Sequence, residues 1–259
     1  MKLSVIFVNY HSTEEINSLV ADLKICNGCS FIVVDNSLDF KTEADGIKVI
    51  RPIRNLGFGS AINAACLNIS ADWIILVNPD ITIKHEEWLK FVEELSRIDS
   101  SVSVVHPSFE KQKTRVLIGG ELTYPILSNN LDQKSNYTSI PGFSLVALRF
   151  NAYTIIGGFD PNIFMYAEDL DYCIRIYRKY GFSGFKSIKC TYDHLGGGSY
   201  KGYFGKIRRA VHSFNSHYYV INKNFPENSF FHIICISLML ALPRYFNWFR
   251  FCLGAKLGS

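Results

Sequence analysis

The sequence lacks the features that mark several large classes of protein. It contains no long run of like charge, and its 27 Lys and Arg residues against 23 Asp and Glu residues leave a formal net charge of only +4. This balance gives no reason to expect nucleic acid as a partner. The longest uncharged apolar stretch, which ends at Pro243, is shorter than the roughly 20 residues that a helix needs to span a membrane.

The seven cysteines form neither a metal-binding pattern nor a disulfide framework. Cys26 and Cys29 make a C-x-x-C pair, but no second cysteine or histidine pair completes a zinc site. A thioredoxin-like pair would open a helix, whereas this pair falls between a predicted helix and a predicted strand. Unpaired thiols suit a reducing cytosol, and residues 1–12 lack the apolar length and the cleavage site of a signal peptide. We therefore expect a cytoplasmic protein with structural cysteines.

What the sequence does contain is a regular alternation of apolar and amphipathic segments. Strand-length apolar runs occupy residues 3–8, 31–34, 47–50, 73–77 and 102–105, and helical periodicity occupies residues 14–25, 61–69 and 86–98. This alternation is typical of an α/β domain with a largely parallel sheet. After a polar, irregular stretch at 110–137, the apolar pattern returns at 143–150. We predict one domain over residues 1–225 and a separate apolar, aromatic tail over residues 226–259.

Polar residues follow three of the predicted strands. Asn9, Asp35 and Asp80 fall where the carboxyl ends of the strands meet, which is the edge where ligands bind in such sheets. Asp80 ends the tripeptide Asn78-Pro79-Asp80, and an amide and a carboxylate at this spacing can hold Mg²⁺ or Mn²⁺ that also bridges a diphosphate. The same three residues are typical of a plain turn, so this alternative remains open.

Two glycine-bearing segments allow both a structural and a functional interpretation. The glycines of NLGFGS, residues 55–60, precede a predicted helix and would let backbone N–H groups approach an anion. The segment matches neither G-x-G-x-x-G nor the Walker pattern, and a tight turn explains it equally well. His194 precedes a glycine run and is either a structural histidine or a ligand of a metal or diphosphate.

Three acids gather at the start of an amphipathic helix in FMYAEDLDYCIRIYRKYG, residues 164–181. We expect a buried stripe at helical spacing and a helix that ends at Gly181, with the stripe made of Leu170, Cys173, Ile174 and Tyr177. Asp171 is four residues before Arg175, which predicts a surface ion pair. Glu168 and Asp169 lie in the first turn, where the helix dipole favours the ionised form. Capping and solubility alone would explain all three acids.

Seven short segments occur in the order and approximate spacing of a known family: VNY, VVDNS, NLGFGSAIN, LVNPDI, GFSLVALR, GGFDPNIFMYAEDLDYCIRIYRKYG and HLGGGS. With them the chain resembles the family 2 glycosyltransferases, specifically the bacterial rhamnosyltransferase-like branch, over residues 2–219. The resemblance implies a GT-A fold, which is a Rossmann-like α/β arrangement. It also implies inverting transfer of a sugar from a nucleotide donor.

The resemblance assigns roles to individual residues. The donor site would be built from Asn9, Asp35, Asn55, Gly57, Asn63, Asn78 and Asp80, with Asn9 and Asp35 at the nucleotide base and ribose. Asp80 would bind Mg²⁺ or Mn²⁺ at the family's D-x-D position, where this chain reads N-P-D and keeps one carboxylate. His194 would be a further metal ligand.

The family's E-D motif corresponds to Glu168 and Asp169. Asp169 would be the catalytic base, with Glu168 as the second candidate. An inverting displacement needs such a base because the acceptor hydroxyl loses its proton as it attacks the anomeric carbon. The opposite face needs positive charge for the departing diphosphate, which a divalent ion supplies.

The expected reaction is transfer of a sugar, with rhamnose favoured, from a dTDP- or UDP-sugar. The acceptor would be a glycan, linked to a lipid diphosphate, in the synthesis of bacterial surface polysaccharide such as O-antigen or capsule. Two alternatives remain. One is another nucleotide- or NAD-binding α/β enzyme, although no G-x-G-x-x-G follows the first strand. The other is a non-catalytic subunit that binds glycan or nucleotide within a membrane synthesis complex.

Basic and aromatic residues dominate the C-terminal part. Four basic residues precede a predicted aromatic helix that ends near Asn222, namely Lys201, Lys206, Arg208 and Arg209. In the tail, Arg244 and Arg250 lie among aromatic residues, which is typical of a helix in a membrane interface. We expect the tail to lie on the inner face of the cell membrane. The alternative is a helix packed on the domain or on the partner of a homodimer.

Overall fold

A seven-stranded sheet forms the centre of the computed structural model, which describes residues 1–24, 28–107, 142–194, 202–226 and 234. The strand order is β3-β2-β1-β4-β7-β6-β8, and β7 runs antiparallel to both of its neighbours while the other pairs are parallel. The strands are β1 (Leu3–Asn9), β2 (Cys29–Asp35), β3 (Ile47–Ile50), β4 (Trp73–Val77), β6 (Val104–Pro107), β7 (Leu145–Arg149) and β8 (Phe185–Ile188). The largely parallel sheet predicted from the sequence is confirmed.

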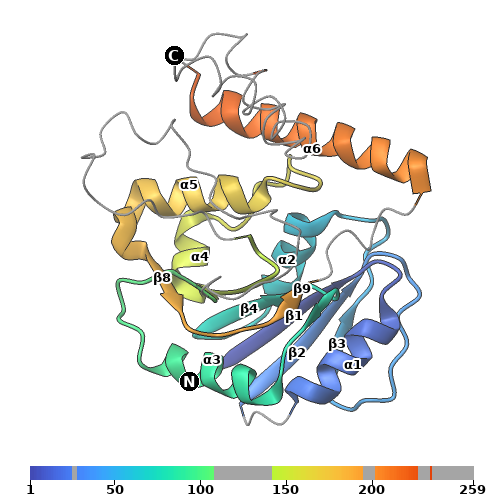
Figure 1. Cartoon of the computed structure of the whole chain (residues 1–259), viewed down its shortest axis with the longest axis vertical. Coiled ribbons are helices and arrows are strands. Elements are labelled where there is room, and N and C mark those ends of the chain that lie inside the picture. Colours follow the sequence, from blue (N-terminus) through green and yellow to red (C-terminus); the bar gives the residue numbers. More distant parts are fainter. Residues whose placement is uncertain (25–27, 108–141, 195–201, 227–233, 235–259) are drawn as a thin grey trace, which may run out of the picture.

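Helices cover both faces of this sheet (Figure 1). They are α1 (Thr13–Leu23), α2 (Phe58–Cys66), α3 (His85–Ser96), α4 (Phe150–Ile156), α5 (Glu168–Tyr180) and α6 (Gly202–Asn224). A short 3-10 turn follows α5 at Gly181–Gly184, and a small second sheet pairs β5 (Ile81–Thr82) with β9 (Asp193–His194). In Figure 1 α6 runs across the top of the molecule, on the side of α5 that faces away from the sheet.

The strands divide the core into two apolar layers. Successive side chains of a strand point to opposite faces, so Val5 and Phe7 of β1 pack in the layer that contains α1 and α3. Ile6 packs in the other layer, with α2, α4 and α5. The central strands are buried on both faces, which explains why they read as continuous apolar runs in the sequence.

Element boundaries differ from the sequence prediction mainly around glycines and basic residues. Helix α2 begins at Phe58 rather than at residue 61. Gly57, whose φ is 77°, is the last residue before the helix. Arg208 and Arg209 lie within α6 and not before it. The predictions for residues 110–137, Cys26 and Lys201 fall outside the described residues, as does the tail beyond residue 226 apart from residue 234. No helix in the described part of the chain is long and apolar enough to span a membrane.

The turn before α2 lies against the loop before α5. The N–H of Phe58 donates a hydrogen bond of 3.1 Å to the carbonyl oxygen of Phe164. A Cβ atom at Gly57 would lie 1.8 Å from the same oxygen. The side chain of Asn36 fixes the turn from the β2 side, since it accepts from Leu56 N–H and donates to Gly57 O. Only glycine therefore fits at position 57.

We expect Gly57→Ala to destabilise the protein more than Gly46→Ala. Both glycines have positive φ, 77° and 75°, but a Cβ at Gly46 meets nothing within 4 Å. Gly46→Ala should cost about 1–2 kcal/mol for the backbone conformation alone, and Gly57→Ala about 1–3 kcal/mol more because Phe164 must move. Urea unfolding of the two variants measures the difference. Equal losses would show that the Phe164 contact does not restrict position 57.

Candidate active site

Asn9 and Asp35 are paired neighbours at the carboxyl ends of β1 and β2, and neither is exposed. Asn9 Nδ2 donates to Asp35 Oδ1 at 2.8 Å, and the second oxygen of Asp35 accepts from Phe40 N–H at 3.0 Å. Asn9 Oδ1 accepts from the N–H of Ser12. These bonds fix the loops that follow both strands. Direct contact of Asn9 or Asp35 with a base or ribose stays a prediction.

A more exposed pair of polar side chains lies just beyond them. His11 Nδ1 is 2.7 Å from Asp39 Oδ2, and the side chains are 63% and 43% exposed. A hydrogen bond from Ser37 is the main reason that the pKa of Asp39 is lowered to about 2, and bonds from His11 and Asn9 add to it against the effect of burial. The sequence rule for strand ends misses Asp39 because it lies four residues after β2 ends.

Asn55 and Asn63, two more of the residues predicted for the donor site, make side-chain hydrogen bonds within the protein. Asn55 Oδ1 accepts from the N–H of Gly57 at 2.8 Å. Asn63, on α2, donates to the carbonyl oxygen of Phe159 at 2.8 Å and accepts from its N–H at 2.9 Å. Both side chains therefore hold the loops around the site in place. A direct role in donor binding stays a prediction for each.

Asp80 and His194 lie together, although they are 114 residues apart in the sequence. The antiparallel pairing of β5 with β9 places Ile81 opposite His194, and His194 Nε2 is 3.1 Å from Asp80 Oδ1. Both side chains are 27% exposed. One carboxylate and one imidazole, open to solvent, suit a divalent ion that takes its remaining ligands from water and substrate phosphates. In the described ranges no cluster of three or more His, Cys, Asp or Glu residues could hold a metal by itself.

One short segment connects the N-P-D turn to the acids of α5. The N–H of Asn78 donates to the carbonyl oxygen of Ser144 at 2.8 Å. The preceding residue, Phe143, donates its backbone N–H to the carboxylate of Asp169. Two successive residues before β7 thus hold Asn78 on one side and Asp169 on the other. The predicted metal-binding turn and the predicted base therefore share one support.

The carboxyl group of Glu168 is buried at the start of α5. Its Oε2 atom is buried and has no hydrogen-bond partner among the described residues. Burial, together with the neighbouring charge of Asp169, raises the pKa of Glu168 to about 8. The expectation that the helix N-terminus keeps this acid ionised is therefore wrong at neutral pH, because loss of hydration outweighs the dipole.

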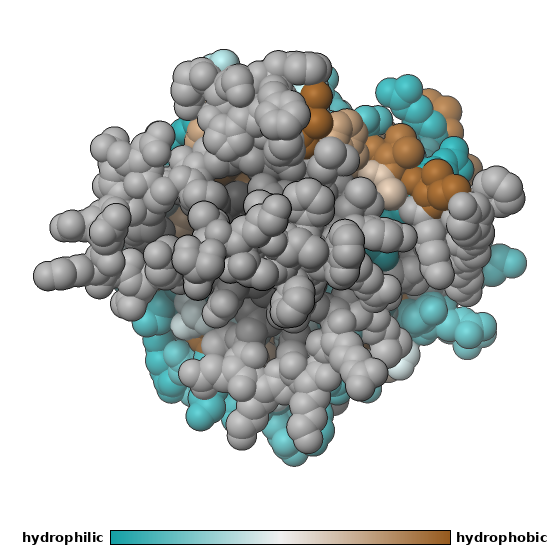
Figure 2. All heavy atoms as spheres, turned by 45° about the horizontal axis from the view of Figure 1, so that its top comes forward, coloured by the Kyte–Doolittle hydropathy of each residue, from teal (hydrophilic) through white to brown (hydrophobic). Residues whose placement is uncertain are grey.

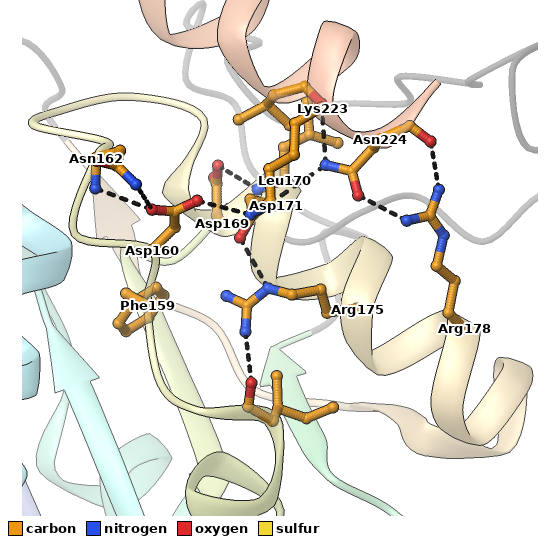
Figure 3. A network of polar contacts seen from close by, with 12 residues as sticks. Phe159, Asp160, Asn162, Asp169, Leu170, Asp171, Arg175, Arg178, Lys223 and Asn224 are labelled. Atoms are coloured by element: carbon orange, nitrogen blue, oxygen red, sulfur yellow. Dashed lines mark hydrogen bonds and ion pairs between the residues drawn. The ribbon is translucent and has the colours of Figure 1, made fainter. Parts of the chain in front are cut away.

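Asp169 differs from Glu168 in its hydrogen bonds. Burial also raises the pKa of Asp169, but the backbone N–H groups of Leu170 and Phe143 oppose this effect by donating to its carboxylate. The bond from Leu170 to Asp169 Oδ1 measures 2.8 Å (Figure 3). When the adjacent acids share one proton, the negative charge is better stabilised on Asp169. The geometry therefore favours Asp169 over Glu168 as a base.

The third acid of the stretch has a structural environment. Asp171 is fully buried and accepts hydrogen bonds from Arg175 Nε and Lys223 Nζ, each at 2.8 Å. The predicted pairing with Arg175 is confirmed, but its predicted place on the surface is wrong because α6 covers this face of α5 (Figure 3). Tyr177 is only half-buried, and the buried stripe is instead completed by Tyr172 and Ile176. The helix ends at Gly181, as expected.

Backbone strain is concentrated around the same edge of the molecule. Within the described part of the chain, four residues other than glycine have positive φ: His11, Leu38, Tyr166 and Ala167. The first two follow β1 and β2, and the last two precede Glu168 directly. Such conformations cost free energy and persist only where the surrounding structure imposes them. The loops that carry the polar residues are thus held in set conformations.

The raised pKa of Glu168 predicts a pH-dependent effect of Glu168→Gln. Between the ordinary value of 4.5 and about 8, the folded protein keeps a proton that the unfolded chain has released, so the free energy of unfolding falls as pH rises. Glutamine removes this dependence. From pH 5 to 8.5, the wild type should lose about 4 kcal/mol relative to Glu168→Gln, since the pKa is raised from 4.5 to about 8 and one pKa unit is worth about 1.4 kcal/mol.

Urea unfolding at both pH values measures this loss. The matched control is Glu86→Gln, because Glu86 is an exposed glutamate in the first turn of α3. If the free energy of unfolding of Glu168→Gln changes between these pH values by as much as that of the wild type and of the control, Glu168 is not protonated in the folded protein.

Comparisons with known proteins agree with this architecture. The chain is 14% identical to glucosyl-3-phosphoglycerate synthase from Mycobacterium tuberculosis, solved with Mn²⁺, UDP-glucose and phosphoglyceric acid, with a TM-score of 0.63 over 86% of this chain and 79% of the other. It is 17% identical to mannosyltransferase PcManGT from Pyrobaculum calidifontis, solved with GDP-Man and Mn²⁺, with a TM-score of 0.57 over 100% and 76% of the two chains. The expected GT-A fold is thereby confirmed.

Sequence comparison adds one relative and one family. Rhamnosyltransferase WbbL of Escherichia coli K12 is 27% identical over 146 residues, which are 46% of this chain and 54% of that protein. The chain therefore matches only about half the length of this curated relative. The sequence model of the family described as "Glycosyl transferase family 2" matches residues 4–153, which is more than half of the 259 residues. The chain therefore belongs to glycosyl transferase family 2.

Proposed function

We propose that the protein is an inverting glycosyltransferase that uses a nucleotide-sugar donor. The observation that carries this proposal is the shared support of Asn78 and Asp169 by residues 143–144. It joins a turn suited to a diphosphate-bound metal to a partly buried acid whose charge is stabilised by backbone N–H groups. Family membership and the GT-A fold support the same reaction class.

Asp169 acts as the general base in this proposal. It takes the proton of the acceptor hydroxyl while that oxygen bonds to the anomeric carbon of the sugar. On the opposite face, the bond from the anomeric carbon to the diphosphate breaks, and the nucleoside diphosphate leaves with both electrons. Glu168 holds its own proton at neutral pH, so the base is the only negative charge in the pair.

The donor is bound at the carboxyl edge of β1, β2 and β4. Asp80 and His194 would hold Mg²⁺ or Mn²⁺, and the bound ion supplies positive charge to the leaving diphosphate. The loops fixed by Asn9 and Asp35 orient the nucleoside, and Asp39 offers its exposed carboxylate there. The Gly57 turn, which packs against the backbone of Phe164, would contribute backbone atoms to the same site.

We assign the donor sugar as rhamnose, carried on dTDP or UDP, and the acceptor as a lipid-diphosphate-linked glycan of bacterial surface polysaccharide. The likeness to rhamnosyltransferase WbbL supports the sugar. The solved relatives are described with UDP-glucose and GDP-Man, which supports a nucleotide-linked donor in general. Their crystals also contain Mn²⁺, which supports a divalent cofactor.

The protein works at the inner face of the cell membrane in this proposal, as a lipid-linked acceptor requires. Ile207 and Val211, one turn apart on α6, are 46% and 52% exposed, and the exposed Arg208 lies beside them. Apolar and cationic side chains on one helix surface are typical of contact with anionic lipid. Figure 2, in which the top of Figure 1 is turned forward, shows hydrophobic and hydrophilic side chains next to each other at its upper right.

Substitutions at the two acidic positions should separate donor binding from transfer. Asp169→Asn should keep donor affinity within about twofold and lower the transfer rate by about 10²–10⁴-fold, the range that a general base contributes. Asp80→Ala should weaken both donor binding and transfer, because it removes a metal ligand. Calorimetric titration of dTDP-rhamnose and UDP-hexoses with Mn²⁺, followed by transfer assays, measures both effects. Near-normal turnover by Asp169→Asn would refute the assignment of the base.

Removal of the chain from residue 230 onward should release the protein from membranes. The full-length protein is expected to sediment with washed membranes, whereas the truncated protein is expected in the supernatant, because the aromatic and basic tail supplies most of the interfacial contact. Immunoblots of the two fractions measure the distribution. Equal recovery of both proteins in the membrane fraction would contradict this role of the tail.

A further inference from the structure

Helix α6 holds the α4–α5 loop, residues 157–167, at several points. Two contacts are hydrogen bonds: Tyr219 donates to Asp160 at 3.0 Å, and Ser216 donates to Met165 O at 2.7 Å. Two more involve aromatic rings: the His212 ring centre lies 5.6 Å from that of Phe164, and the Arg209 guanidinium lies 5.7 Å from the Tyr166 ring. This loop leads directly into Glu168 and Asp169. Helix α6 therefore borders the segment that carries the acid pair.

Lys223 connects the two ends of this segment. Its Nζ lies 2.6 Å from Asp160 Oδ2, near the start of the loop, and 2.8 Å from Asp171 Oδ1, in the first turn of α5 (Figure 3). The side chain of Asp160 is 8% exposed and that of Asp171 is fully buried. One ammonium group thus joins two buried carboxylates that lie on either side of the acid pair in the sequence.

The carboxylates of Asp160 and Asp171 need the positive charge of Lys223. Burial by itself would raise the pKa of Asp160, but hydrogen bonds from Lys223, Asn162 and Tyr219 outweigh it and lower the pKa to about 2. Asp160 is therefore an anion at neutral pH. Arg175 neutralises Asp171 from the α5 side. Without Lys223, Asp160 would keep only neutral hydrogen-bond donors among the described residues, and buried carboxylates that lose their cation are strongly destabilised.

The strained residues lie between the two anchors. Tyr166 and Ala167 have φ values of 67° and 63°, and a residue in this conformation needs the surrounding structure to hold it. Lys223 fixes the chain six residues before Tyr166, at Asp160, and four residues after Ala167, at Asp171. On the opposite side, the Phe164 carbonyl accepts from Phe58 N–H. The conformation that aims Asp169 is thus fixed from outside the loop.

We infer that Lys223 is a positioning residue for the acid pair, acting through Asp160 and Asp171 without touching substrate. This inference rests on the proposed function for its kinetic consequence, but its structural part does not. Loss of Lys223 frees the loop, so the base is less often in place, while the ends of β1, β2 and β4 and the Asp80–His194 pair, which Lys223 does not contact, keep their positions. The effect therefore falls on kcat and not on KM for the donor.

The test compares Lys223→Met with Lys223→Arg and with Arg178→Gln. Arg178 also joins α5 to α6, since its Nη1 donates to Asn224 Oδ1 at 2.8 Å, but it lies in the last turn of α5, away from the loop (Figure 3). Lys223→Met should lower kcat by about tenfold to a hundredfold, the cost of misplacing a catalytic group, with KM for the nucleotide sugar within about twofold. Lys223→Arg should recover most of kcat, and Arg178→Gln should retain it.

Hydrogen exchange gives a readout that does not depend on activity. In Lys223→Met, amide exchange should accelerate in residues 163–171 and at Phe58, whose N–H is bonded to Phe164. Arg178→Gln should leave both regions at the wild-type rate. If the wild type transfers no sugar, the proposed function fails, and the exchange data still decide whether Lys223 holds the loop.

Two results would overturn the inference. One is wild-type exchange and wild-type kcat in Lys223→Met. The other is an equal loss of kcat and of exchange protection in Arg178→Gln, which would assign the effect to docking of α6 as a whole.

If Lys223→Met does not fold, Asp160→Asn replaces it, because this variant weakens the loop anchor and leaves the bond between Lys223 and Asp171 intact. Faster exchange at 163–167 in Asp160→Asn supports the inference, and unchanged exchange there contradicts it.

Discussion

The contact between the Gly57 turn and the backbone of Phe164 is the constraint on which the site depends. The turn leads from β3 into α2, whereas Phe164 lies in the loop before α5, and the two meet through the bond from Phe58 N–H. The backbones of Gly57 and Phe164 approach so closely that no side chain fits at position 57. This contact brings the loop that leads into the acids of α5 against the turn that follows β3, beside the proposed donor site.

The same short stretch of acids has three different electrostatic environments. Glu168 is buried without a hydrogen-bond partner for Oε2 in the described part of the chain, so it keeps its proton at neutral pH. Asp169 is only partly buried and has backbone N–H donors, which stabilise its charge. Asp171 is buried between two cations and ties α5 to α6. Burial and hydrogen-bond partners, rather than position in the first turn, thus distinguish a neutral acid, the proposed base and a structural anchor.

Sequence patterns predict the sheet well because buried strands such as β4 are continuous apolar runs. The meeting of Asp80 with His194 follows only from the family resemblance, since the pairing that joins them spans 114 residues. Helical periodicity places Asp171 wrongly, because it takes no account of α6 on that face. Lys223 could not be identified at all. Nothing near it in the sequence points to residues 160 and 171, which it reaches across 63 and 52 residues.

A crystal structure of the protein with Mn²⁺ and a nucleotide sugar tests the central claim most directly. The account predicts an anomalous manganese peak at the carboxylate of Asp80 and the imidazole of His194. It also predicts that the carboxylate of Asp169 faces the anomeric carbon from the side opposite the diphosphate. Manganese bound elsewhere, or Asp169 on the same side as the diphosphate or turned away from the sugar, would contradict the account.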